Sequence, residues 1–175
     1  MKFLVLLIAV FSVFSLIGEN LIINGDISQG AKYWTLGTWT KSPGKREIKK
    51  EGNISYLSLS NTKDNKCATL CVQQLKLKPN TTYAFKFKMR TIDVKRQLPN
   101  KRTHGAGISI TAGKFLFSGA AETWTMIAGT TPWTEYKGQF NTKDLKVGQL
   151  VSFSPSLTYA TGTVDFTGFS LEEVK

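Results

Sequence analysis

The residues that could carry out acid–base, nucleophilic or metal chemistry are few and scattered in this sequence. His104 is the only histidine, and no Gly-x-Ser-x-Gly motif, cysteine–histidine pattern or glycine-rich phosphate loop accompanies it. The 12 Asp and Glu residues are spread through polar stretches, so that only the fold could bring a catalytic carboxylate pair together. Two cysteines and one distant histidine do not make a zinc site. We therefore predict a protein with no catalytic residues, no metal ligands and no enzymatic activity.

Three cations alternate along the most regular segment of the chain, residues 83–90. Lys86, Lys88 and Arg90 point to one side, and the other side carries Tyr83, Phe85, Phe87 and Met89. If the polar side is concave, it forms a cationic groove suited to uronate or sulfate groups, in which Arg90 can bind a carboxylate in bidentate fashion. If it is convex, it is ordinary solvated surface. Tyr56, which alternates with Leu57, has the same two interpretations.

The elements that must position these side chains are predicted to be strands. Short alternating runs separated by Gly, Pro, Asn, Lys or Ser clusters are typical of an all-β sandwich or barrel, here with eight to ten strands. Residues 151–159 form a second long strand, whose apolar side carries Val151, Phe153, Leu157 and Tyr159. Pro155 within it predicts an edge strand or a bulge. Residues 93–103 are predicted to be an exposed basic loop. Shorter strands are predicted over 54–60, 72–77, 107–111, 115–118, 136–140 and 164–174.

The first residues have the features of a secretory signal. Lys2 precedes an apolar run over 3–14, and the small residues Ser15 and Gly18 follow it. The run is about 12 residues long, whereas roughly 20 are needed to span a bilayer. We expect a signal peptide over 1–18, cleavage after Gly18, and a secreted domain over 19–175 that does not insert into a membrane.

The charge of the chain indicates the kind of partner. The formal net charge is +11 at pH 7, which favours anionic surroundings. For an exported protein without a nucleic-acid motif, anionic glycans or cell surfaces fit better than nucleic acid. The alternative is a well-solvated surface that serves solubility alone. We expect a monomer.

Two cysteines and two glycosylation sequons leave alternatives open. Cys67 and Cys71 would lie about 13 Å apart in an extended strand, beyond the roughly 7 Å limit for a disulfide. A bridge therefore requires a turn or bulge between them, and otherwise both are free, buried thiols. Asn53 and Asn80 each begin an Asn-x-Ser/Thr sequon that could carry an N-glycan.

Four stretches resemble one known family, in the family's order. Residues 20–25 (Asn-Leu-Ile-Ile-Asn-Gly), followed by Gly30 and Trp34, resemble the opening of the jelly-roll carbohydrate-binding modules of families four, nine and twenty-two. Residues 74–83 resemble the turn of Pro-Asn-Thr that leads into a long strand beginning with Tyr83. Residues 133–140 and 164–174 resemble the later Trp-containing strand and the closing strand.

The resemblance implies an all-β, antiparallel β-sandwich of the jelly-roll, galactose-binding-like type. It also implies a carbohydrate-binding protein that recognises a polysaccharide or glycan through aromatic platforms and polar groove residues. The runner-up function is an extracellular structural or adhesion protein with the same fold and no sugar site. Family members usually bind a structural calcium ion through two aspartates near the end, where this chain has Thr167 and Gly168. We therefore expect no cofactor; for calcium, only Asp26 and backbone carbonyls would remain as ligands.

The resemblance also divides the tryptophans between packing and binding. Trp34 and Trp133 match tryptophans that are mostly core residues in the family, so we assign both to packing. Trp39 and Trp124 are the candidate platforms. Trp124 stands among polar neighbours, which favour an exposed position over one in the core. The predicted ligand-binding residues are Trp39, Trp124, Tyr56, Lys86, Lys88 and Arg90.

Overall fold

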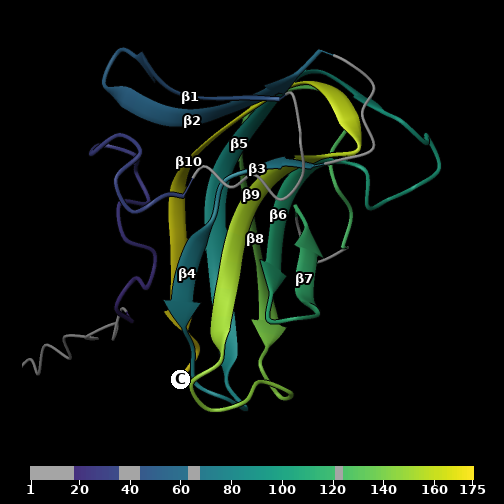
Figure 1. The fold of residues 1–175 in the computed structure, drawn as a ribbon. Coiled ribbons are helices and arrows are strands. Elements are labelled where there is room, and N and C mark those ends of the chain that lie inside the picture. The colour runs from purple at the N-terminus through teal and green to yellow at the C-terminus, as the bar shows by residue number, and fades with distance from the viewer. Residues whose placement is uncertain (1–17, 36–43, 63–67, 121–123) are drawn as a thin grey trace, which may run out of the picture.

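The structure is a computed structural model that describes residues 18–35, 44–62, 68–120 and 124–175. These residues form ten strands in two antiparallel sheets, as the all-β prediction requires (Figure 1). The first sheet has the strand order β1 (Lys45–Glu51), β2 (Ile54–Asn61), β10 (Ala160–Glu173), β5 (Thr82–Arg96) and β8 (Gly129–Asn141).

The second sheet is built around β9 (Leu150–Thr158). One side of β9 pairs with two short strands, β3 (Ala68–Leu70) and β4 (Gln73–Lys76). The other side pairs with β6 (Gly105–Thr111), which in turn pairs with β7 (Phe115–Gly119). In the part of the chain that the structure describes, no helix is long and apolar enough to cross a membrane.

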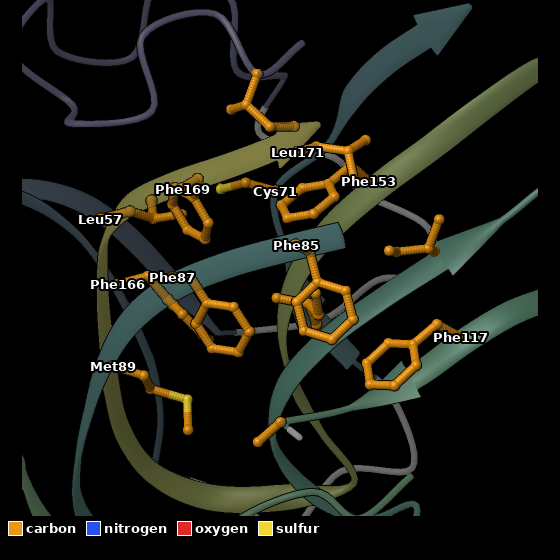
Figure 2. Close-up of a cluster of buried hydrophobic side chains, with 14 of the residues drawn as sticks. Leu57, Cys71, Phe85, Phe87, Met89, Phe117, Phe153, Phe166, Phe169 and Leu171 are labelled. Carbon is orange, nitrogen blue, oxygen red and sulfur yellow. The ribbon is translucent and has the colours of Figure 1, made fainter. Parts of the chain in front are cut away.

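The hydrophobic core lies between the two sheets and follows from the alternation of apolar residues. Along β5, Tyr83, Phe85, Phe87 and Met89 are buried as predicted. Their rings meet those of the opposite sheet, and Phe85 and Phe117 have ring centroids 4.6 Å apart (Figure 2). Alternation fixes the second face as well: each residue between two buried ones points away from the core. Both sheets therefore present an outer face, and these two faces are where function must be sought.

The prediction that Pro155 marks an edge strand or a bulge is wrong, because β9 is a central strand. Pro155 lies opposite Ile108 of β6, and its carbonyl accepts a hydrogen bond from the Cys71 N–H at 3.2 Å on the other side. Cys71 falls in the break between β3 and β4. Since a strand residue directs its N–H and C=O to the same side, the missing N–H of proline falls at this break in the neighbouring strand.

Two further expectations need correction. The predicted loop over 93–103 begins later, because β5 continues to Arg96, with Val94 buried and Arg96 paired with Ala160. The strand β1 was not predicted, since its sequence is mostly charged and its side chains are mostly exposed. It forms nonetheless because each of its residues pairs with β2 in an unbroken register.

Cys71 is a free thiol buried between the sheets. Burial raises its pKa to about 12, so the thiol stays protonated at neutral pH. Of the two alternatives for the cysteines, the free, buried thiol describes Cys71, while Cys67 lies outside the described residues.

Candidate ligand-binding site

Four of the six predicted ligand-binding residues lie on the outer face of the first sheet. Lys86 and Lys88 are exposed there. Lys86 stands opposite Lys137 of β8, whereas Lys88 stands opposite Glu135. Across this face, Lys86 therefore stands opposite a like charge and Lys88 opposite an unlike one.

Arg90 lies on the same face and is fully occupied by protein partners. Its Nε donates to Asp165 Oδ2 at 2.7 Å, and its Nη1 forms an ion pair with Glu51 at 2.8 Å. Its guanidinium carbon also lies 5.0 Å from the ring centre of Tyr56 and 4.8 Å from that of Trp133. We call these five residues the Arg90 cluster. Because its aromatic faces and its donors are already engaged, the cluster holds five strands together.

The assignment of Trp133 to packing is confirmed, although it packs on the outer face and not in the core. Trp133 is half-buried on the outer face, with its ring edge-on to that of Tyr56 at 5.6 Å. The assignment of Trp34 to the core is confirmed: it is buried, packs against Phe169 at 5.0 Å, and donates its indole N–H to the carbonyl of Asn24. Trp39 lies outside the described residues.

A trough of about 620 Å³ lies on the outer face of the second sheet. Its size falls within the range of small-molecule sites, roughly 300–1,000 Å³. Its floor consists of hydroxyl side chains that alternate with core residues along β6, β7 and β9, namely Ser109, Thr111, Ser118, Ser152, Ser154, Ser156 and Thr158. Two side chains from β3, Ala68 and Leu70, form one apolar wall.

The register of the sheet arranges these hydroxyl groups as a grid. Ser154, Ser109 and Ser118 stand in one row across β9, β6 and β7, and the oxygens of Ser109 and Ser118 are 3.4 Å apart. Neighbouring rows lie about 7 Å apart along the strands, and neighbouring hydroxyls about 5 Å apart across them. Each hydroxyl can donate and accept, so the floor can match a ligand that carries hydroxyl groups of its own.

Three aromatic side chains border the hydroxyl floor. Phe115, Trp124 and Tyr159 are exposed by 62%, 47% and 38%. Trp124 and Tyr159 have positive backbone φ angles of 54° and 44°, a conformation that bulky residues rarely adopt and that costs of order 1–3 kcal/mol. The fold thus holds two large apolar rings in water and in strained backbone, an arrangement that stability alone does not favour.

Glycines bring the Trp124 segment to the trough. A Cβ atom on Gly107 would lie 2.6 Å from the carbonyl oxygen of Gly119, and one on Gly119 would lie 2.9 Å from Trp124 Cα. The chain after β7 can therefore fold back closely over the end of β6, where Ala106 and Ile127 exchange backbone hydrogen bonds of 2.8 Å. The close approach depends on the absence of two side chains.

Of the five predicted ligand-binding residues that the structure describes, only Trp124 lines the trough. The hydroxyl floor was missed, although the run of Ser and Thr at alternate positions of 152–158 was a readable signal. Tyr159 was expected on the apolar side of its strand, but its positive φ breaks the alternation and turns its ring to the trough. Phe115 carried no signal, because an exposed phenylalanine cannot be told from a core one by sequence.

The side chains present do not fit the calcium site that the resemblance implies. The Thr167 hydroxyl lies 2.9 Å from the carbonyl oxygen of Ser55 and 3.3 Å from that of Asp26, and it can donate to both. The Asp26 carboxylate accepts hydrogen bonds from the backbone and the side chain of Ser28, which lower its pKa. Among the residues described, no group of three or more His, Cys, Asp and Glu could hold a metal. A hydrogen-bonding hydroxyl thus stands where oxygen ligands would have to converge on an ion.

Comparisons with known proteins establish the family and the fold. A family model described as a carbohydrate binding domain matches residues 19–159. A CBM4 module has a TM-score of 0.57 at 14% identity over 87% of this chain and 99% of its own. A family 16 carbohydrate binding module has a TM-score of 0.51 at 18% identity over 89% of this chain and 100% of its own. The CBM22-1 xylan-binding domain from Paenibacillus barcinonensis has a TM-score of 0.52 at 12% identity over 90% of this chain and 96% of its own.

These identities are low enough that the three solved structures establish the fold alone, which is the predicted jelly-roll β-sandwich. A search of curated proteins by sequence found no match.

Proposed function

This chain belongs to the carbohydrate binding domain family, and on that premise we propose that it is a secreted, non-catalytic protein that binds a polysaccharide in the trough of the second sheet. The observation that carries the proposal is the combination of a hydroxyl floor with exposed, strained aromatic rings. Sugars present ring faces that stack on aromatic side chains and hydroxyl groups that exchange hydrogen bonds with the floor. The proposed export rests on the signal-like residues 1–18.

The strength of binding follows from the areas involved. Covering roughly 50–100 Å² of one aromatic face contributes about 1–2.5 kcal/mol. Two rings, Trp124 and Tyr159, together with a few hydrogen bonds give dissociation constants from about millimolar to micromolar. We expect weak single-site binding, with little change in the trough because its floor is a paired sheet.

The lining of the trough favours binding without catalysis. None of the side chains that line it within the described residues is charged, so this site contains no carboxylate pair to act as acid and base or nucleophile. Uncharged hydroxyls and rings also favour a ligand whose stacked part is neutral.

The runner-up function, a structural or adhesion protein without a sugar site, requires the aromatic side chains to be used in packing. Tyr56 and Trp133 are used in that way, within the Arg90 cluster. Trp124 is not: its ring touches that of Phe117 at 5.3 Å, but almost half of its surface remains exposed at the trough. Exposure at a trough therefore favours the sugar-binding function.

The test is affinity electrophoresis of the mature protein through gels that contain neutral polysaccharides, beside Trp124→Ala and Tyr33→Ala. Tyr33 is the matched control, because it is exposed by 48% and does not line the trough. We expect one class of polymer to retard the wild type and Tyr33→Ala but not Trp124→Ala. Equal retardation of all three would place binding outside the trough, and no retardation by any polymer would favour the structural protein.

A further inference from the structure

The trough has a positively charged end. Its lining residue Thr103 is preceded in the chain by Lys101 and Arg102, and all three are exposed. We call Lys101 and Arg102 the basic rim. Neither residue takes part in a salt bridge within the described part of the chain. Within the described residues, two cations without an ion-pair partner thus border a lining that carries no charge.

The basic rim is fixed to the aromatic wall by hydrogen bonds. The carbonyl of Arg102 accepts from the N–H of Met126 at 2.8 Å. Arg96, which lies beneath the rim, donates from Nη2 to the carbonyl of Met126 at 2.6 Å and from Nη1 to that of Pro99 at 3.3 Å. Since Met126 is two residues from Trp124 in the chain, these hydrogen bonds connect the segment of the aromatic platform to that of the basic rim.

His104 lies within the positive field of the basic rim. Its ring lies 4.9 Å from that of Tyr159, which lines the trough. Burial lowers the pKa of His104, and the nearby charges of Lys101 and Arg96 lower it further. Burial would penalise a charge of either sign, but the contributions of Lys101 and Arg96 show that the field at this end is positive.

Resting on the proposed function, we propose that the trough takes an acidic glycan, whose neutral rings stack on Trp124 and Tyr159 above the hydroxyl floor while a carboxylate or sulfate group binds the basic rim. The neutral lining explains why the anion must lie at the end of the trough. Arginine pairs with carboxylate and sulfate through two parallel hydrogen bonds, and lysine adds a point charge. The same charges on the first sheet, Lys86 and Lys88, lie on the other face of the molecule and play no part.

The experiment compares neutral and acidic polymers that share a backbone. Dissociation constants are measured at 0.15 M salt for hydroxyethylcellulose with carboxymethylcellulose, arabinoxylan with glucuronoxylan, and dextran with dextran sulfate. The variants are Lys101→Gln/Arg102→Gln, the charge-matched control Lys86→Gln/Lys88→Gln, and Trp124→Ala. The carboxylated and sulfated members distinguish the two sources of the anionic group.

We expect the acidic member of at least one pair to bind about three- to tenfold more tightly than its neutral partner, as two partly exposed ion pairs allow. The difference should vanish in Lys101→Gln/Arg102→Gln and persist in the charge-matched control. Binding of both members should weaken in Trp124→Ala, because the rings and the anion belong to one ligand.

Several outcomes would overturn the inference. Equal binding of neutral and acidic members would remove the rim's role and leave the proposed function intact. An equal loss in both charge variants would assign the preference to the net charge of the whole protein. Acidic binding that persists in Trp124→Ala would make the rim a site apart from the trough. No binding by any polymer would remove the proposed function as well.

Discussion

The outer faces of the two sheets contain similar aromatic side chains, which are packed on the first sheet and exposed on the second. On the first sheet, Tyr56 and Trp133 enclose Arg90, which also binds Asp165 and Glu51. On the second sheet, Trp124 and Tyr159 stand exposed beside uncharged hydroxyl groups. The first face has its aromatic surface covered by a cation from its own chain, and the second leaves that surface open to a ligand.

The difference shows that an aromatic side chain can serve as a binding platform only where no side chain of the protein already covers its ring. An aromatic ring, a cation and a carboxylate on one face describe a sugar site and a structural cluster equally well until their contacts are known. Arg90 decides the matter on the first sheet, because Asp165 is 3% exposed and needs a positive partner. On the second sheet, Trp124 and Tyr159 remain exposed at the trough with φ angles of 54° and 44°, which supports the proposed platform.

The largest expected effect comes from removing Arg90. Arg90→Met leaves Asp165 buried without its charge partner, and we expect the free energy of unfolding to fall by about 3–5 kcal/mol. Polysaccharide binding by the folded fraction should be unchanged. Urea denaturation followed by tryptophan fluorescence measures the first quantity, and affinity electrophoresis the second.

The matched control is Glu51→Gln, which removes the exposed partner of Arg90. Because the Glu51 side chain is 62% exposed, we expect a loss of only about 0–1 kcal/mol. Equal destabilisation by both variants would show that the ion pairs contribute nothing specific. A loss of binding in folded Arg90→Met would show that the two faces do not work separately.

The next effect separates binding from stability on the second sheet. Trp124→Gly and Tyr159→Gly remove the rings but relieve the positive-φ strain, which offsets lost contacts with Phe117 and His104. We expect polysaccharide affinity to fall at least about tenfold while the free energy of unfolding changes by less than about 1.5 kcal/mol. Titration calorimetry measures the affinity, and thermal unfolding measures the stability. Strong destabilisation with unchanged affinity would assign both rings to structure.

The same contrast explains how far the sequence could predict this protein. Alternation along 83–90 was enough for a correct strand and a correct core face, and four family-like stretches were enough for the fold. The site was harder, because alternation says that Arg90 points outward but not that Asp165, Glu51, Tyr56 and Trp133 meet it there. Those contacts come from four other strands and depend on long-range register.

The trough shows the opposite limit of sequence reasoning. Trp124 was found by its polar neighbours, a local signal. Tyr159 was assigned to the apolar side because a positive φ is invisible in the sequence of a non-glycine residue. The glycines that let the Trp124 segment approach β6 could be read only once Gly107 and Gly119 were known to lie beside each other.

A smaller effect concerns pH at the end of the trough. Burial, Lys101 and Arg96 lower the pKa of His104 in the folded protein, whereas the unfolded chain keeps the ordinary value of 6.5. As the pH falls below 6.5, the unfolded chain therefore takes up the proton first, and stability declines until the pH passes the folded pKa. Urea midpoints from pH 7.5 to 5 should fall more for the wild type than for His104→Gln. Identical pH profiles would show that His104 feels no such field.

The smallest expected effect is that of calcium, which we expect to change neither stability nor polysaccharide binding. On the outer face of the first sheet, the Thr167 hydroxyl already bridges the carbonyls of Ser55 and Asp26, so that a hydrogen-bond donor does there what a cation would otherwise do. We expect melting temperature and polysaccharide affinity to be the same with 5 mM calcium and with chelator. We also expect Thr167→Val to lower the free energy of unfolding by about 1–3 kcal/mol, because it removes the hydroxyl donor that the two carbonyls share. A higher melting temperature in calcium would mean that the carbonyls and Asp26 do accept an ion. The first sheet's outer face would then depend on a ligand too, and the contrast with the second would narrow to the kind of ligand each face binds.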